Sequence, residues 1–175
     1  RFKYDQTLHH SQSLAHDAKE RSVRNARASS VARIEKGKLA AEDAAVALWF
    51  LKVYAPIDRS LGKILNTFPS ELKALSADPY DDSLMEVFCD YLETSKKRID
   101  KISSLYRAMP IPSSIQAFGL GLYHCLSKVD DAFLELERYT MGYVDDYLHD
   151  GREMLREAKQ LRRRLQKERS PVEDR

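Results

Sequence analysis

The sequence holds little of what usually breaks or cross-links a chain. Among its 175 residues there are only six Gly, six Pro and two Cys. So few Gly and Pro leave few obligatory breaks, which favours long helices. No apolar run approaches the roughly 20 residues of a membrane-spanning helix. Cys89 and Cys125 form no CxxC pair, and we interpret both as reduced, buried core residues of a cytoplasmic protein.

Recognisable catalytic motifs are also missing. The chain has no GxSxG nucleophile turn, no phosphate-binding P-loop and no glycine-rich dinucleotide turn. We therefore expect neither catalytic residues nor a cofactor, a metal or a small-molecule ligand. The first residue is not Met and no signal peptide is visible, so we interpret the sequence as a fragment of a longer protein.

Helical periodicity dominates the rest of the sequence. Large apolar residues recur at three- and four-residue steps over residues 84–106 and again over 122–148, which is the spacing of amphipathic helices. The sequence therefore predicts an all-α fold, a bundle of four to five helices joined by short connections. The breaks that we expect are a stop at Gly37, a kink at Pro56, a turn over 70–77, a helix start at Asp78–Pro79, a helix end at 109–114 and a break at Asp150–Gly151.

The first six residues, RFKYDQ, alternate with a period of two instead. Phe2 and Tyr4 would point one way, and Arg1, Lys3 and Asp5 the other. We interpret this alternation as a short N-terminal β-strand. A lone strand has no partner within a helical chain, so its backbone groups have to pair elsewhere. We expect it to pair with the same strand of a second copy, as the intermolecular ribbon of a ribbon-helix-helix homodimer.

Formal charge divides the chain into three parts. Residues 1–38 hold nine Lys or Arg against four Asp or Glu, residues 39–150 hold eleven against eighteen, and residues 151–175 hold nine against five. Basic ends around an acidic middle indicate a polyanionic partner, which we take to be double-stranded DNA. We predict a DNA-binding and dimerisation segment at 1–38, a helical bundle at 39–170 and a disordered tail at 171–175. The residues that we expect to contact DNA are Arg1, Lys3, Asp5, Lys19, Arg21, Arg24 and Arg27.

Three other clusters have functional interpretations that we weigh against simpler ones. The segment DDYLHD places Asp145, Asp146, His149 and Asp150 on shared helix faces, where carboxylates can hold Mg²⁺ and a diphosphate. We favour an acidic helix end. The histidines at positions 9, 10 and 16 have no ligand partner at metal-site spacing, so we place them beside nucleic acid or on the surface. The aromatic group at positions 49, 50 and 54 fits core packing better than ligand binding.

Two long segments resemble a known family. Similarity to AcaB-type transcriptional regulators of integrative and conjugative elements and conjugative plasmids is found in SADPYDDSLMEVFCDYLETSKKRIDKI and in AFGLGLYHCLSKVDDAFLELERYTMGYVDDYLHDGREMLREAKQLRRRL. It spans roughly residues 46–166 and is carried by Asp78-Pro79-Tyr80, by Asp130-Asp131 and by the basic final helix. The resemblance implies a dimeric, sequence-specific DNA-binding activator of conjugative-transfer genes, with a ribbon-helix-helix reading head.

We therefore predict a dimeric transcriptional regulator, and two alternatives stay open. One is a non-enzymatic helical scaffold or partner-binding protein of a mobile element, using the acidic middle and the basic tail for protein contacts. The other is a metal-dependent enzyme on diphosphate substrates, centred on Asp145, Asp146 and Asp150.

Overall fold

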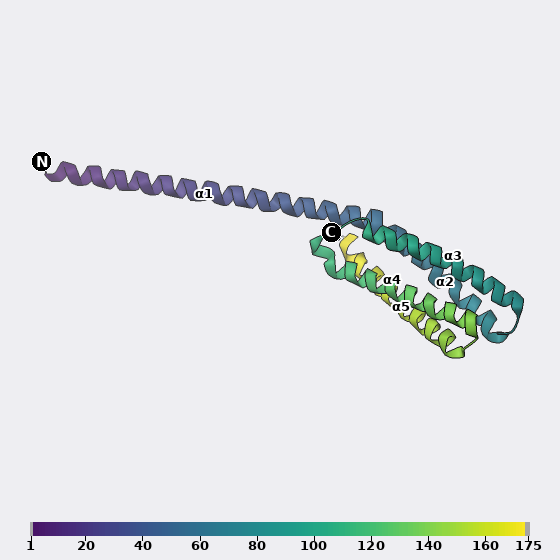
Figure 1. Ribbon diagram of the computed structural model, residues 1–175. Helices are drawn as coiled ribbons and strands as arrows, with labels where there is room; N and C mark the ends of the chain where they lie inside the picture. Colours follow the sequence, from purple (N-terminus) through teal and green to yellow (C-terminus); the bar gives the residue numbers. More distant parts are fainter. Residues whose placement is uncertain (1, 174–175) are drawn as a thin grey trace. The chain divides into compact units, whose positions relative to one another are not determined.

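The computed structural model describes the backbone of residues 2–173 and the side chains of residues 19–67 and 73–169. Within this part of the chain all regular structure is helical, so the predicted all-α fold of four to five helices is confirmed. Figure 1 shows the elements along the chain. They are α1 (Phe2–Trp49), the π-helix η1 (Phe50–Tyr54), α2 (Ala55–Ala77), α3 (Asp82–Arg107), the 3-10 helix η2 (Ser113–Ile115), α4 (Gln116–Gly142) and α5 (Asp145–Glu173).

The first of two compact units, residues 1–44, is built from helix α1. The backbone is helical from Phe2 onward, so the predicted strand and its ribbon are not seen in the described residues, and Arg1 lies outside them. A helix satisfies its own backbone groups four residues apart and needs no second chain for pairing. Helix α1 also passes Gly37 without the predicted stop. Every side chain described from residue 19 to residue 41 is exposed.

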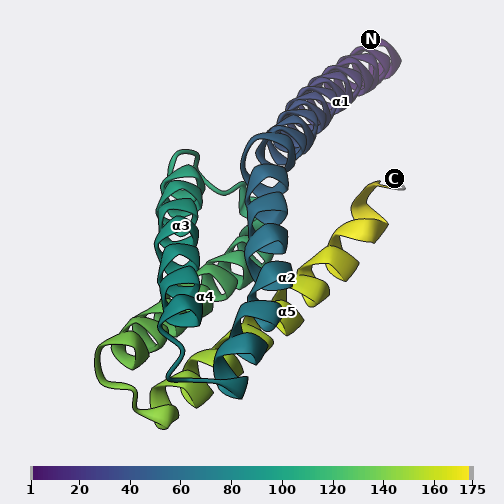
Figure 2. The same ribbon diagram turned by 90° about the vertical axis from the view of Figure 1, so that its right-hand side faces the viewer.

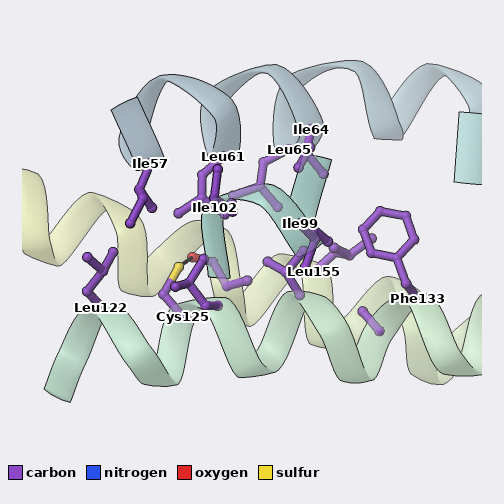
Figure 3. Close-up of a cluster of buried hydrophobic side chains, with 14 of the residues drawn as sticks. Ile57, Leu61, Ile64, Leu65, Ile99, Ile102, Leu122, Cys125, Phe133 and Leu155 are labelled. Carbon is purple, nitrogen blue, oxygen red and sulfur yellow. Dashed lines mark hydrogen bonds between the residues drawn. The ribbon is translucent and has the colours of Figure 1, made fainter. Parts of the chain in front are cut away.

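The second unit, residues 45–175, contains a four-helix bundle. Helices α2, α3, α4 and α5 alternate in direction; each packs against the next, and α5 also contacts α2 (Figures 1 and 2). The apolar faces of the four helices meet in one core. No helix in the described part of the chain is long and apolar enough to cross a membrane. The core residues drawn in Figure 3 include Ile57, Leu61, Ile64, Leu65, Ile99, Ile102, Leu122, Cys125, Phe133 and Leu155.

The π-helix η1 ends two residues before Pro56. Pro56 has no N–H to donate, and its ring crowds the carbonyl four residues earlier, so the predicted kink takes the form of a widened turn. This turn places Trp49 and Tyr54 in the core, where both rings meet Phe118 edge to face at centroid distances of 6.3 and 5.1 Å. The prediction that these aromatic residues pack in the core is confirmed.

The turn between α2 and α3 differs from the predicted one. Helix α2 continues through residues 70–77, and α3 begins at Asp82 rather than at Pro79. The cap is Asp81, whose carboxylate accepts hydrogen bonds from the backbone N–H of Ser83 at 2.8 Å and of Leu84 at 3.1 Å. A further bond from the Ser83 hydroxyl, together with these two, lowers the pKa of Asp81. Several aspartates near this turn could cap the helix, and the fold determines which of them does so.

The corner between α4 and α5 lies at Tyr143 rather than at Gly151. Tyr143 has φ 54° and ψ 30°, the left-handed conformation that glycine usually supplies at the end of a helix. Helix α5 runs through Gly151 without a break. A Cβ on Gly151 would lie 2.7 Å from Cγ of Leu136 and 3.1 Å from the carbonyl oxygen of Ala132. Gly151 therefore lets α4 and α5 approach more closely than a side chain would allow.

We expect the substitution Gly151→Ala to lower the free energy of unfolding by about 1–3 kcal/mol, the usual cost of overpacking. The clash outweighs the helix preference of Ala over Gly, which is about 1 kcal/mol. Gly37→Ala is the matched control, because a Cβ there meets nothing within 4 Å and only the helix preference remains. Denaturant unfolding followed by circular dichroism measures both. Stabilisation by Gly151→Ala would contradict the packing role.

Candidate functional site

A surface groove is lined mainly by α2, with one residue each from α3 and α5. Its lining contains four cationic side chains and one carboxylate, and the other three residues are Gly or polar. Residues four apart on a helix share a face, which is why the α2 residues of the groove come in such pairs. We call it the basic groove, and it consists of Asp58, Arg59, Gly62, Lys63, Asn66, Thr67, Arg98 and Arg162.

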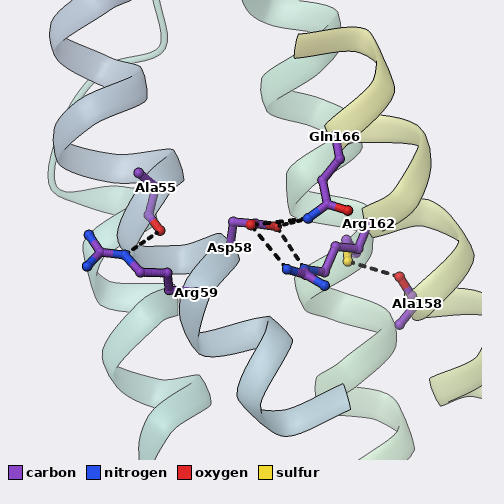
Figure 4. Close-up of polar contacts among 7 residues, drawn as sticks. Ala55, Asp58, Arg59, Ala158, Arg162 and Gln166 are labelled. Carbon is purple, nitrogen blue, oxygen red and sulfur yellow. Dashed lines mark hydrogen bonds and ion pairs between the residues drawn. The ribbon is translucent and has the colours of Figure 1, made fainter. Parts of the chain in front are cut away.

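An ion pair between α2 and α5 fixes one wall of the basic groove (Figure 4). Nε and Nη2 of Arg162 donate to the two carboxylate oxygens of Asp58 at 2.8 and 3.1 Å. The amide of Gln166 donates to the same carboxylate at 3.3 Å. The side chains of Arg162 and Asp58 are only 18% and 19% exposed. This bidentate, partly buried ion pair fixes the position of the Arg162 guanidinium.

Gly62 provides the space for this ion pair. A Cβ on Gly62 would lie 3.0 Å from Nη2 of Arg162 and 3.3 Å from its Cζ. Gly62 stands one turn after Asp58, on the same face of α2. The absence of a side chain at Gly62 therefore leaves room for Arg162 against α2.

Three further cations of the basic groove have no acidic partner within the part of the chain that the structure describes. Nε of Arg59 donates to the backbone carbonyl of Ala55 at 3.4 Å (Figure 4). Arg59, Lys63 and Arg98 form no ion pair with any residue that the structure describes. The carboxylate of Asp58 already forms an ion pair with Arg162. The groove therefore carries uncompensated positive charge, and a concave surface of one sign attracts ligands of the opposite sign.

Two titratable groups near this ion pair stay neutral at ordinary pH. Burial, and then the nearby Asp58 carboxylate, raise the pKa of Tyr54 to about 12. Burial also raises the pKa of Cys125 to about 12, and its Sγ donates to the carbonyl of Ala158 at 3.4 Å. A buried, protonated thiol is not a nucleophile. The predicted burial is confirmed for Cys125 and wrong for Cys89, which is exposed.

The residues predicted to contact DNA do not belong to the basic groove. Arg1 and the side chains of Lys3 and Asp5 lie outside the described residues. The other four side chains are exposed along α1, and contact between them and DNA stays a prediction that the structure does not test. These four are Lys19, Arg21, Arg24 and Arg27.

The acidic segment DDYLHD lies in the first two turns of α5, with its Asp and His side chains exposed. Nδ1 of His149 is 3.7 Å from Oδ1 of Asp150. Among the residues that the structure describes, no three His, Cys, Asp or Glu side chains are grouped as a metal site requires. The histidines at positions 9, 10 and 16 have side chains outside that part of the chain.

Sequence reasoning missed the basic groove. Arg59 and Lys63, one turn apart on α2, were the available signal, because they form a cationic stripe beside the apolar one. Arg98 and Arg162 belong to two other helices. Only the folded bundle brings these four residues to one groove, so spacing along the chain could not reveal it.

Comparison with known proteins gives a family match. The family model described as cyanobacterial DnaJ chaperone, C-terminal domain, matches residues 41–173. No curated protein and no solved structure matches the chain. The match spans both segments on which the resemblance to AcaB-type regulators depended, and it overturns that resemblance. The predicted function as a DNA-binding activator of conjugative-transfer genes is therefore wrong.

Proposed function

The chain belongs to the family of cyanobacterial DnaJ chaperone C-terminal domains, and on this premise we propose that it binds another polypeptide as part of a DnaJ-type chaperone. The proposed site is the basic groove, and the proposed ligand is an acidic segment of the partner. The sequence-based alternative of a partner-binding helical protein is closer to this proposal than the predicted regulator was. The proposal does not retain the predicted link to a mobile genetic element.

The uncompensated charge of the basic groove is the observation that carries the proposal. Arg59, Lys63 and Arg98 line the groove without an acidic partner among the described residues. Carboxylates of a bound segment would pair with these cations, and complementary charge sets both the rate and the specificity of such an encounter. Asn66 adds an amide that can donate to a backbone carbonyl of the segment.

Asp58 of the basic groove and Gln166 of α5 have a positioning role in this proposal. Asp58 and Gln166 hold Arg162 in one orientation before any ligand arrives. A side chain that is already ordered loses less conformational freedom on binding than a free one does. Arg162 is therefore expected to add affinity at a small entropic cost.

The proposal is tested with a fluorescein-labelled, glutamate-rich peptide and fluorescence anisotropy. The variant Arg59→Gln/Lys63→Gln/Arg98→Gln should bind this peptide about tenfold more weakly than the wild type. Each exposed charge pair contributes up to about 1 kcal/mol, and about 1.4 kcal/mol corresponds to a factor of ten in affinity. Binding should also weaken as salt is added, because exposed charges are screened.

The matched control removes three exposed cations elsewhere in the bundle, in the variant Lys73→Gln/Arg107→Gln/Arg152→Gln. It has the same net charge as the groove variant, so a general electrostatic effect would weaken both equally. Equal binding by the two variants, or preference of the wild type for a lysine-rich peptide at the groove, would reject the proposed site.

A further inference from the structure

The two turns at one end of the bundle form a second surface, distinct from the basic groove. The α2–α3 turn and the α4–α5 corner lie at the same end in both views (Figures 1 and 2). Tyr139 of α4 belongs to this end, because its ring meets Tyr143 at a centroid distance of 6.2 Å. Burial, and then the charges of Asp145, Tyr143 and Tyr80, raise the pKa of its hydroxyl. We call this surface the tyrosine–aspartate end.

Large apolar side chains are exposed at the tyrosine–aspartate end. Tyr80 is 83% exposed and Met141 is 80% exposed, and Tyr143 and Val144 are each close to half exposed. Tyr and Met are enriched at protein interfaces, and exposed patches of large apolar side chains are typical of such interfaces. The backbone of Tyr143 is left-handed at a position where glycine is usual. A tyrosine is thus held outward at a corner where stability alone would favour glycine.

Exposed carboxylates flank these apolar residues along the chain. Asp78, Asp82, Asp145 and Asp146 are exposed, and none of them forms an ion pair with a residue that the structure describes. Asp78 accepts one hydrogen bond, from the backbone N–H of Tyr80 at 3.4 Å. The end therefore combines apolar area with uncompensated negative charge, the opposite of the charge in the basic groove.

A buried polar atom lies under the same surface. Tyr139 has no exposed area, and its hydroxyl finds no hydrogen-bond partner among the described residues. A buried hydroxyl without a partner is costly, and native proteins satisfy nearly all of them. Its ring packs against Tyr143, which is a residue of the exposed surface.

We propose that the tyrosine–aspartate end docks a basic polypeptide segment that also carries large apolar side chains. Lysine or arginine side chains of the segment pair with the four aspartates, and its apolar side chains cover Tyr80, Met141 and Tyr143. An acidic segment is repelled here, because like charges across an interface are unfavourable. The chain thus has two docking surfaces of opposite charge, and this one does not depend on the basic groove.

The test uses a fluorescein-labelled peptide of alternating leucine and lysine, with anisotropy as the readout. Tyr80→Ala/Tyr143→Gly should weaken binding about tenfold, because exposed tyrosines at interfaces are often the residues of largest effect. The thermal midpoint should change little, since glycine relieves the left-handed backbone at position 143. Asp145→Asn/Asp146→Asn should weaken binding and reduce its salt dependence.

Two controls make the result specific. Asp100→Asn/Glu168→Gln neutralises two exposed carboxylates elsewhere in the bundle and should bind the peptide as the wild type does. A peptide of alternating leucine and glutamate should not bind at this end. The inference is overturned if neither surface variant weakens binding, or if both peptides bind equally. It is also overturned if sedimentation shows a dimer that Tyr80→Ala/Tyr143→Gly dissociates while the basic peptide does not bind, because the surface would then serve self-association.

Discussion

Replacing Asp58 with Ala is expected to lower the free energy of unfolding of the bundle by about 2–3 kcal/mol. The substitution leaves the guanidinium of Arg162 between α2 and α5 without its carboxylate, and it removes the hydrogen bonds from Gln166 to that carboxylate. Removal of one partner of a fully buried ion pair costs about 3–5 kcal/mol. Arg162 retains 18% of its exposure, so water compensates part of that cost. Chemical denaturation of the two proteins measures the difference.

The double variant Asp58→Leu/Arg162→Met is the control for this prediction. Because it removes both charges and fills the space with apolar atoms, it should recover most of the lost stability. Recovery would show that the cost in Asp58→Ala comes from the unpaired cation. An unchanged free energy of unfolding in Asp58→Ala would mean that the ion pair does not stabilise the packing of α5 against α2.

Trp49→Ala is expected to have the larger effect, a loss of about 3–5 kcal/mol, as for other buried aromatic residues. The Trp49 side chain is completely buried, and its ring meets Phe50 and Phe118 edge to face at centroid distances of 5.7 and 6.3 Å. Because folded domains are stable by only about 5–15 kcal/mol, this loss would bring the bundle close to unfolding. Thermal unfolding followed by circular dichroism measures it.

Trp49→Phe separates the two contributions of this residue. The indole Nε1 has no hydrogen-bond partner among the described residues, so its removal relieves an unsatisfied buried donor. Phenylalanine retains most of the apolar contact and should cost only about 1 kcal/mol. A cost as large as that of Trp49→Ala would instead mean that Nε1 has a partner, such as a buried water, in solution.

The helices of the bundle could be predicted because their apolar residues follow one face over many turns. The end of α3 was foreseen from the prolines at positions 110 and 112, which cannot continue a helix. The kink at Pro56 was foreseen as a position, but its form as a π-helix depends on how Trp49 and Tyr54 pack in the core.

The failures have a common physical cause, because each depends on contacts that only the fold creates. Gly151 was predicted to break a helix, yet it sits where α4 and α5 touch. Gly37 was predicted to stop a helix, yet a single glycine costs a long helix only about 1 kcal/mol. The alternating residues at the start of the chain matched a strand, but residues 2–6 extend α1, whose backbone bonds need no second chain.

The candidate site was less predictable than the fold. Charge counts along the chain drew attention to its basic ends, while the basic groove lies on α2, in the part of the chain with net negative charge. A count along the sequence averages cations and carboxylates that fall on different faces of the helices. The groove therefore depends on which faces of α2, α3 and α5 meet, and on the Asp58–Arg162 pair that fixes them.

The measurement that tests the central claim most directly is amide chemical-shift mapping of the chain during titration with the glutamate-rich peptide. We predict that the shifted amides cluster at residues 59–67 of α2 and around Arg98 and Arg162, while those at Tyr80 and Tyr143 stay in place. Shifts confined to the tyrosine–aspartate end, or no shifts at saturating peptide, would contradict an acidic polypeptide segment in the basic groove.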